Sequence, residues 1–231
     1  MRVRPAVRVR IYGAVLLTVL GLASPVGAQL PGTRVPGGCD VPVDRRAGEF
    51  GCYLTATQAL EKLPDEAIFW HVYSYPTRAA AAAARQTSAS TVVDSLGKVW
   101  LFTIAAREWQ PAAGERVAVI GPLLLSPAKQ YTARYMEAVF PPNQSMQTAV
   151  HRHSGPEAWF VLTGTQCLRT PESTMVIRAG HSGFVSAGPP MMLTSVGTEI
   201  RRALVLVLHE TSEPWMTITS DWTPTTACPS E

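Results

Sequence analysis

The stretch that decides the fold reads His151-Arg152-His153-Ser154-Gly155-Pro156-Glu157, and Gly164 follows after six further residues. Side chains alternate along a strand, so His151 and His153 lie on one face of an extended segment. Gly155 and Pro156 form a turn signal at which the chain reverses. Glu157 then begins the next, antiparallel strand, where its carboxylate lies beside the two imidazoles.

Two imidazoles and one carboxylate on one face predict a facial metal site with positions left open for water or a ligand. We expect His151, His153 and Glu157 to bind one divalent transition metal ion, with Fe, Mn, Cu, Ni and Zn all allowed. The alternative is a pair of surface histidines beside a solvated glutamate. Trp159 and Val161 share the face of Glu157, which favours an inward face, and Trp159 is the expected aromatic wall of a small-molecule pocket.

The segments around this stretch predict a mainly β fold. From residue 91 onward, short apolar or alternating runs are separated by Gly, Pro and Ser, as in β-barrels and sandwiches. The expected strands are 91–93, 98–105, 116–125, 131–140, 147–153, 157–163, 165–169, 175–178, 191–194 and 199–209. Before them we expect a helix at 55–63, a strand at 68–75 and a helix that Thr77 caps over the alanine run 79–84. A small α+β segment therefore precedes the barrel.

The N-terminus has the order of a secretory signal peptide. Arg2, Arg4, Arg8 and Arg10 precede the apolar run 11–23, and small residues at 26 and 28 mark a cleavage site before Gln29. The run of 13 residues is shorter than the ~20 that a membrane-spanning helix needs. We expect a secreted or periplasmic protein with no membrane span in the mature chain.

Composition supports a globular protein that does not bind nucleic acid. Hydrophobic residues make up 46% of the 231 residues and charged residues 16%, enough apolar material for a core. The net charge of +3 includes the four N-terminal arginines, and without residues 1–28 the count is 16 basic against 17 acidic side chains. A mature chain of net charge −1 predicts no basic nucleic-acid surface.

In an exported protein the four cysteines are expected to form disulfides, and three connectivities are possible. Cys39 and Cys52 are close in sequence and bracket a polar, Gly-containing loop, so we expect them to pair. Elimination then pairs Cys167 with Cys228, which would pin the C-terminal tail. A thiolate metal site is the competing interpretation, but no C-x2-C pair is present.

The segment that begins at His151 resembles the cupin superfamily. Its first motif, H-x-H-x3-E-x6-G, is matched by residues 151–164, although Ser145 replaces the usual opening glycine. Its second motif, G-x5-P-x-G-x2-H-x3-N, is degenerate: Gly180 and Gly188 match, while Ser186, Met191 and Ser195 replace the proline, the metal-binding histidine and the asparagine. The resemblance implies a cupin-type jelly-roll barrel over residues 113–215, and it places Met191 where the fourth metal ligand usually lies.

Cupins include enzymes and binding proteins, so the fold does not choose the function. One hypothesis is an exported metal-dependent enzyme, oxygenase-like or isomerase-like, acting on a small organic molecule. The other is a non-catalytic cupin that binds a small molecule or sugar, with Met191 as pocket wall. No catalytic residue beyond the ligands is evident, and a homodimer is left open. The expected segments are 1–28 (signal peptide), 29–112 (disulfide-held arm and α+β segment), 113–215 (barrel) and 216–231 (tail).

Overall fold

The computed structural model describes residues 35, 36, 38–61 and 66–229. The expected signal peptide, residues 1–28, lies outside these described residues. None of the helices in the described ranges is both long enough and apolar enough to cross a membrane.

Most of the described chain is extended. The elements, in chain order, are the 3-10 helix η1 (Val43–Arg45), β1 (Gly51–Ala59), β2 (Ile68–Tyr75), α1 (Arg78–Ala83), β3 (Ser90–Ser95), β4 (Lys98–Ala105), β5 (Glu115–Leu123), β6 (Tyr131–Phe140), β7 (His151–Arg152), β8 (Glu157–Thr163), β9 (Thr165–Arg169), β10 (Thr174–Arg178), β11 (Ser182–Val185), β12 (Met192–Val196), β13 (Arg201–Glu210) and β14 (Thr217–Ile218).

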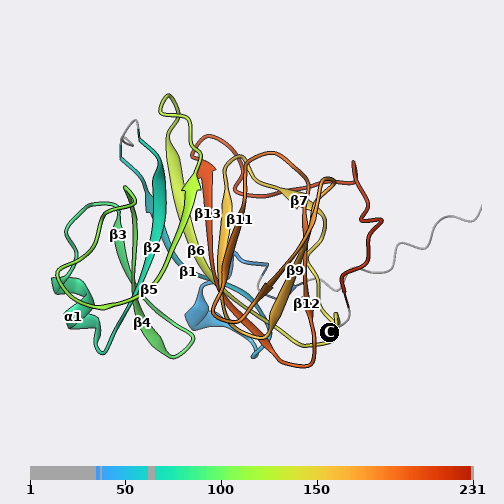
Figure 1. The fold of residues 1–231 in the computed structure, drawn as a ribbon, viewed down its shortest axis with the longest axis horizontal. Coiled ribbons are helices and arrows are strands. Elements are labelled where there is room, and N and C mark those ends of the chain that lie inside the picture. The colour runs from blue at the N-terminus through green and yellow to red at the C-terminus, as the bar shows by residue number, and fades with distance from the viewer. Residues whose placement is uncertain (1–34, 37, 62–65, 230–231) are drawn as a thin grey trace, which may run out of the picture. The chain divides into compact units, whose positions relative to one another are not determined.

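These strands form four sheets, and all pairs of named strands are antiparallel. A five-stranded sheet has the order β1-β6-β13-β8-β11, and a four-stranded sheet has the order β3-β4-β2-β5. A three-stranded sheet, β10-β9-β12, and the pair β14-β7 complete the set. Figure 1 shows the five-stranded sheet between the four-stranded sheet on one side and the two smaller sheets on the other. The expected mainly β fold is confirmed.

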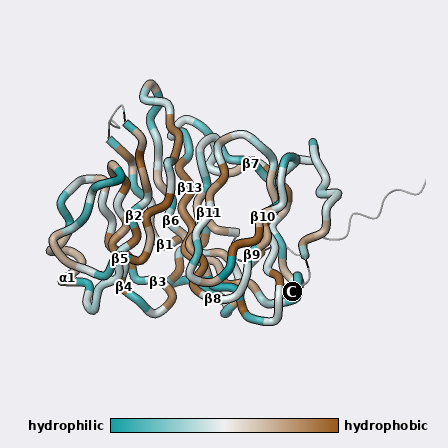
Figure 2. The backbone as a smooth tube through the Cα atoms, viewed as in Figure 1, coloured by the Kyte–Doolittle hydropathy of each residue, from teal (hydrophilic) through white to brown (hydrophobic). Residues whose placement is uncertain are grey.

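The five-stranded sheet is buried on both faces, which explains why its strands are apolar along their whole length. On β13, Ala203 and Val207 face the smaller sheets, while Leu204 and Leu208 face the four-stranded sheet. We call the residues packed on the side of Ala203 and Val207 the barrel core, and those packed on the side of Leu204 and Leu208 the N-terminal core. Figure 2 shows hydrophobic colour along the strands of this layer and hydrophilic colour in many of the connecting loops.

The N-terminal core is rich in stacked aromatic rings. Trp70 packs edge-on against Phe102 with 5.3 Å between ring centroids, and Phe102 stacks on Tyr135 at 5.1 Å. Tyr135 comes from β6 of the five-stranded sheet, whereas Trp70 and Phe102 come from the four-stranded sheet. These contacts join the two sheets across a dry interface.

The expected helix at 55–63 is wrong, because residues up to Ala59 belong to β1 and pair with β6. Sheet pairing overrides the moderate helix propensity of this stretch. The second expected helix is confirmed as α1, since the Thr77 side chain accepts a hydrogen bond from the Ala80 amide. The strand β11 was not predicted. It has only four residues, none of them fully buried, and it is defined by its pairing with β8.

The four-stranded sheet takes strands from both sides of residue 112, since β2 pairs with β4 before it and with β5 after it. The five-stranded sheet likewise includes β1, which pairs with β6. The expected arm and the expected barrel therefore share both large sheets.

The structure contains the two expected disulfides. Cys39 pairs with Cys52 across 4.5 Å between Cα atoms, and Cys167 pairs with Cys228 across 6.0 Å. The first bridge holds the chain before η1 against β1, and the second holds the C-terminal segment against β9. The described residues contain no free cysteine.

Candidate metal centre

The three expected ligands lie around one tight turn. His151 belongs to β7, His153 follows it, and Glu157 is the first residue of β8. Gly155 sits in the turn between them, where an added Cβ would lie 1.8 Å from the carbonyl oxygen of Leu208. The turn therefore needs glycine to pass close to β13.

The turn brings the ligand atoms of all three side chains within 4.8 Å of one another. The Nε2 atom of His153 lies 3.0 Å from Glu157 Oε2, and the Nε2 atom of His151 lies 3.8 Å from the same oxygen. All three residues are buried, between 3% and 5% exposed. The exposed-surface alternative for these histidines is therefore wrong, and the arrangement can hold a metal ion.

Backbone carbonyls fix the orientation of both imidazoles. The Nδ1 atom of His151 lies 2.8 Å from the Ala149 oxygen, and the Nδ1 atom of His153 bonds the carbonyl of Trp215. An imidazole that donates from Nδ1 to a carbonyl keeps its Nε2 lone pair free for a metal. Both Nε2 atoms point at the same carboxylate oxygen, which is the geometry of a facial ligand set.

The Glu157 carboxylate is held in its ionised form. Burial disfavours the charge, but the electrostatic attraction of His153 and His151 and their hydrogen bonds to the carboxylate more than offset burial and lower the pKa of Glu157 to about 2. The indole Nε1 of Trp159 also donates to Oε1 at 3.0 Å. Oε2 remains on the side of the two imidazoles, ready to ligate a cation.

Met191 lies directly opposite His151. The two residues form an isolated antiparallel bridge, with amide-to-carbonyl distances of 3.0 and 2.8 Å. Side chains of directly opposed residues share a face, so the Met191 thioether points into the barrel core beside the His151 ring. Met191 and Trp159 are both fully enclosed in that core. Their roles as fourth ligand and pocket wall stay predictions.

An aromatic contact that the sequence did not predict lies against His153. The Trp215 ring stacks on His153 with 5.7 Å between ring centroids and 22° between planes. The Arg134 guanidinium lies over the same Trp215 ring, 4.6 Å from its centroid. It also donates hydrogen bonds to the Cys39 carbonyl and to Asp40. Trp215 is separated from His153 by 62 positions, so no local sequence signal links them.

One further charge lies inside the barrel. Arg201 begins β13 with its guanidinium 4.3 Å from the Phe140 ring centroid and hydrogen bonded to Gln166. Burial lowers the pKa of Arg201 to about 10, while the negative charge of Glu157 acts in the opposite direction. The sequence analysis missed this residue, whose position at a strand start resembles that of an exposed arginine.

The remaining histidines do not join the centre. His71 lies in the four-stranded sheet, where its Nε2 atom is 2.8 Å from the Ala106 oxygen and its ring meets Trp109. His209 directs Nδ1 at the carbonyls of Glu210 and Glu213. His181 is exposed. Neither His71 nor His209 replaces the histidine absent at position 191.

Comparisons with known proteins give only distant structural matches. No protein-family model matches the sequence, and a search of curated proteins gives no match. A solved cupin-like protein from Thermotoga maritima is similar at 12% identity and a TM-score of 0.34, over 38% of this chain and 64% of that protein. Cupin-2-domain and cupin-superfamily proteins recur among the matches.

Two of the similar structures are enzymes. The DMSP lyase from Ruegeria pomeroyi DSS-3 is 20% identical with a TM-score of 0.32, over 38% of this chain and 43% of the lyase. An oxalate oxidase in complex with glycolate is 18% identical with a TM-score of 0.32, over 37% of this chain and 45% of the oxidase. The chain thus spans less than two thirds of each of these proteins, and at these TM-scores the similarity carries no functional conclusion.

Proposed function

We propose that this chain is an exported cupin-fold protein that binds one divalent transition metal ion through His151, His153 and Glu157. The observation that carries the proposal is the convergence of both Nε2 atoms on one carboxylate oxygen while both Nδ1 atoms bond carbonyls. Histidines on an exposed strand would not be buried, oriented by backbone carbonyls and directed with both Nε2 atoms toward one carboxylate oxygen. Three protein ligands leave coordination positions for a small organic molecule.

The donor set fits a divalent transition metal ion. Imidazole suits Fe, Ni, Cu and Zn, and a carboxylate adds the negative charge that offsets part of the ion's charge. A bound ion would supply Lewis-acid chemistry to a ligand in the open positions. The chain itself orients the ligands through Ala149 and Trp215, and Trp215 excludes water from the His153 side.

The reaction class that fits best is an oxygenase-like or isomerase-like conversion of a small organic molecule. A non-catalytic cupin that binds a small molecule or sugar is the second candidate. One observation favours it: besides the ligands and His71, the buried charged residues in the described ranges are Arg201 and Glu137, and Glu137 is engaged at the four-stranded sheet, where it accepts a hydrogen bond from Ser95. An arginine stays protonated and does not serve as general base.

Location and assembly are also part of the proposal. Two disulfides fit an oxidising compartment, which supports a secreted or periplasmic protein. A homodimer and the division at residue 112 also belong to the proposal; the division is a boundary along the chain, since both large sheets take strands from its two sides.

Elemental analysis of the purified mature protein tests the proposal. We expect close to one transition metal ion per chain, and loss of most of it in Glu157→Gln, which keeps the shape of the side chain but removes its charge. A wild-type protein that is folded yet free of metal, even after incubation with each of the five candidate ions, would refute the metal-binding function.

A further inference from the structure

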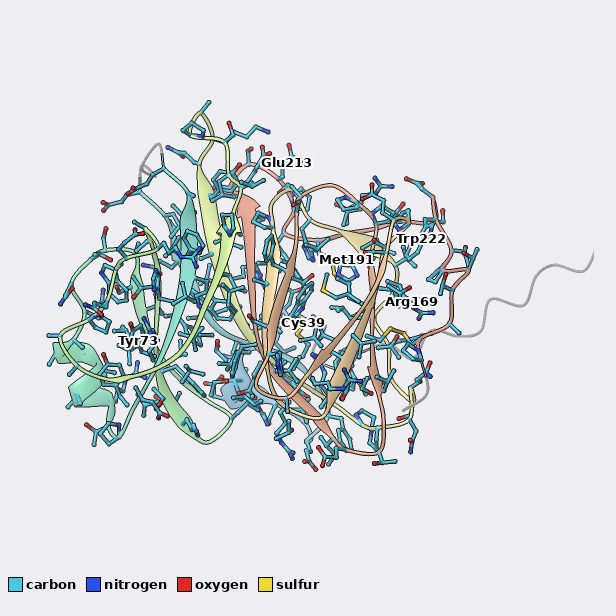
Figure 3. The ribbon with its side chains drawn as sticks, in the orientation of Figure 1. Cys39, Tyr73, Arg169, Met191, Glu213 and Trp222 are labelled. Carbon is cyan, nitrogen blue, oxygen red and sulfur yellow. A yellow bond between two sulfur atoms is a disulfide. The ribbon has the colours of Figure 1, made fainter. Side chains whose placement is uncertain are left out.

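A pocket whose lining includes none of the three metal ligands lies at the edge of the barrel. It has a volume of about 310 Å³ and is lined by the β9–β10 turn, residues 169–174, and by the C-terminal segment 222–226. Figure 3 shows Arg169 and Trp222 near each other on this side of the molecule. Leu168 points into the barrel core, so Arg169, next to it on β9, points outward.

The lining combines one aromatic ring with many hydroxyl groups. Trp222 is half-buried and forms the aromatic wall. Hydroxyl-bearing residues share the lining: Thr170 and Ser173 bond each other within the turn, and the others are Thr174, Thr225 and Thr226. An aromatic face takes up the apolar side of a ring, whereas hydroxyls exchange hydrogen bonds with polar groups along its edge. This combination suits a ligand that is itself amphipathic and rich in hydroxyls.

The charges of the lining favour a neutral ligand over an anion. Arg169 is half-buried and has no carboxylate partner among the described residues; it donates to the Met192 sulfur at 2.9 Å and to Thr194 at 3.2 Å, and its buried Nε has no partner. Glu172, exposed on the same turn, has no cationic partner in the described ranges. The lining thus offers a fixed donor and a fixed acceptor of opposite charge. A hydroxyl-rich neutral molecule uses both, while an anion attracted to Arg169 meets Glu172.

The second wall of the pocket is covalently fixed. Cys228 follows the lining segment and is bonded to Cys167 on β9, two residues before Arg169. The Arg169 guanidinium also reaches the Thr226 carbonyl at 3.4 Å. A wall that is held in place before binding loses less conformational freedom when a ligand arrives, so even a small pocket gains affinity.

We propose that this pocket is a binding site for a neutral sugar ring, with the ring stacked on Trp222 and its hydroxyls bonded to Arg169 and Glu172. The site uses none of the three metal ligands, so the proposal does not depend on the metal-binding function. A surface sugar site would hold the protein on a glycan while the barrel acts independently.

NMR titration of the full mature protein tests the proposal. The probes are glucose, galactose and N-acetylglucosamine, each to 50 mM, with acetate as the anionic probe. We expect at least one sugar to shift the Trp222 indole and Arg169 Nε resonances with millimolar affinity. Trp222→Ala and Arg169→Ala should weaken that affinity at least about tenfold, whereas Trp222→Phe should keep most of it because the ring face remains. Arg85→Ala, at an exposed arginine after α1, is the matched control and should bind as wild type.

Three results would overturn the assignment. No shift at either resonance with any of the three sugars would exclude a neutral sugar ring. Equal affinity in Trp222→Ala, in a protein whose other resonances match wild type, would place binding elsewhere. A larger response to acetate than to the sugars would make the pocket an anion site.

Discussion

The two faces of the five-stranded sheet differ in what they hold. On β8, Ala158 and Phe160 belong to the N-terminal core, where apolar and aromatic side chains fill the space between two sheets. The next residue on each side, Glu157 or Trp159, belongs to the face where three polar ligand groups converge. The face toward the N-terminal core therefore holds packed apolar side chains, and the other face holds the three polar ligand groups, although the residues on both faces are buried. Burial alone does not mark the site; the satisfied, oriented polar groups do.

The largest expected effect would break this division from the packing side. Phe102→Ala removes a ring that contacts Trp70, Trp100 and Tyr135, and should lower the free energy of unfolding by about 3–5 kcal/mol. Urea denaturation measures this change. Phe102→Leu, which leaves a smaller cavity, should cost less and should retain full metal content. Loss of metal from folded Phe102→Leu would show that the two faces are not independent.

A second substitution sharpens the other side of the division. Trp215→Ala keeps the carbonyl that bonds His153 but removes the ring stacked on it. We expect metal affinity to fall about tenfold, the size usual for a supporting contact, and release to a chelator to speed up. Stopped-flow measurement with a chromogenic chelator gives the rate. Trp109→Ala, which removes a half-buried ring over His71 instead, is the matched control and should leave release unchanged.

Met191→His tests whether the position opposite His151 belongs to the centre. An imidazole is a stronger ligand than a thioether for Mn2+ and Zn2+, so affinity should rise by about tenfold if the side chain reaches the ion. Isothermal titration with both ions, alongside thermal melts, measures affinity and stability. Unchanged affinity with a lower melting temperature would identify Met191 as packing, because the variant then buries a polar ring without a partner.

The pH dependence of the centre tests ligation by histidine without any substitution. Protons compete with the ion for imidazole nitrogen, so affinity should fall by at least about tenfold between pH 7.5 and 5.5. Glu157 does not add to the pH dependence of metal affinity over this range, because its pKa is lowered to about 2 and the carboxylate stays ionised. Titrations at several pH values measure the slope. An affinity that is constant down to pH 5.5 would contradict ligation by histidine.

Local patterns predicted the strands well and the long-range contacts poorly. The strands β2, β4, β6, β8 and β9 begin and end at the residues expected from alternation and turn signals. The facial group was predictable because its three residues lie within seven positions around one turn. Trp215, Arg134 and Arg201 were not predictable, because their partners lie far away in sequence. The helix expected at 55–63 failed for the same reason: β6, 70 or more positions later, decides its conformation.

Metal titration of two histidine variants tests the central claim most directly. His151 and His71 are both buried and both have a ring nitrogen 2.8 Å from a carbonyl oxygen, but they lie on β7 and in the four-stranded sheet respectively. Calorimetric titration with Zn2+ or Mn2+ should show one site in wild type and in His71→Ala, and binding weakened about a hundredfold or more in His151→Ala, since two ligands make a weak site. Full-affinity binding by folded His151→Ala would contradict the account.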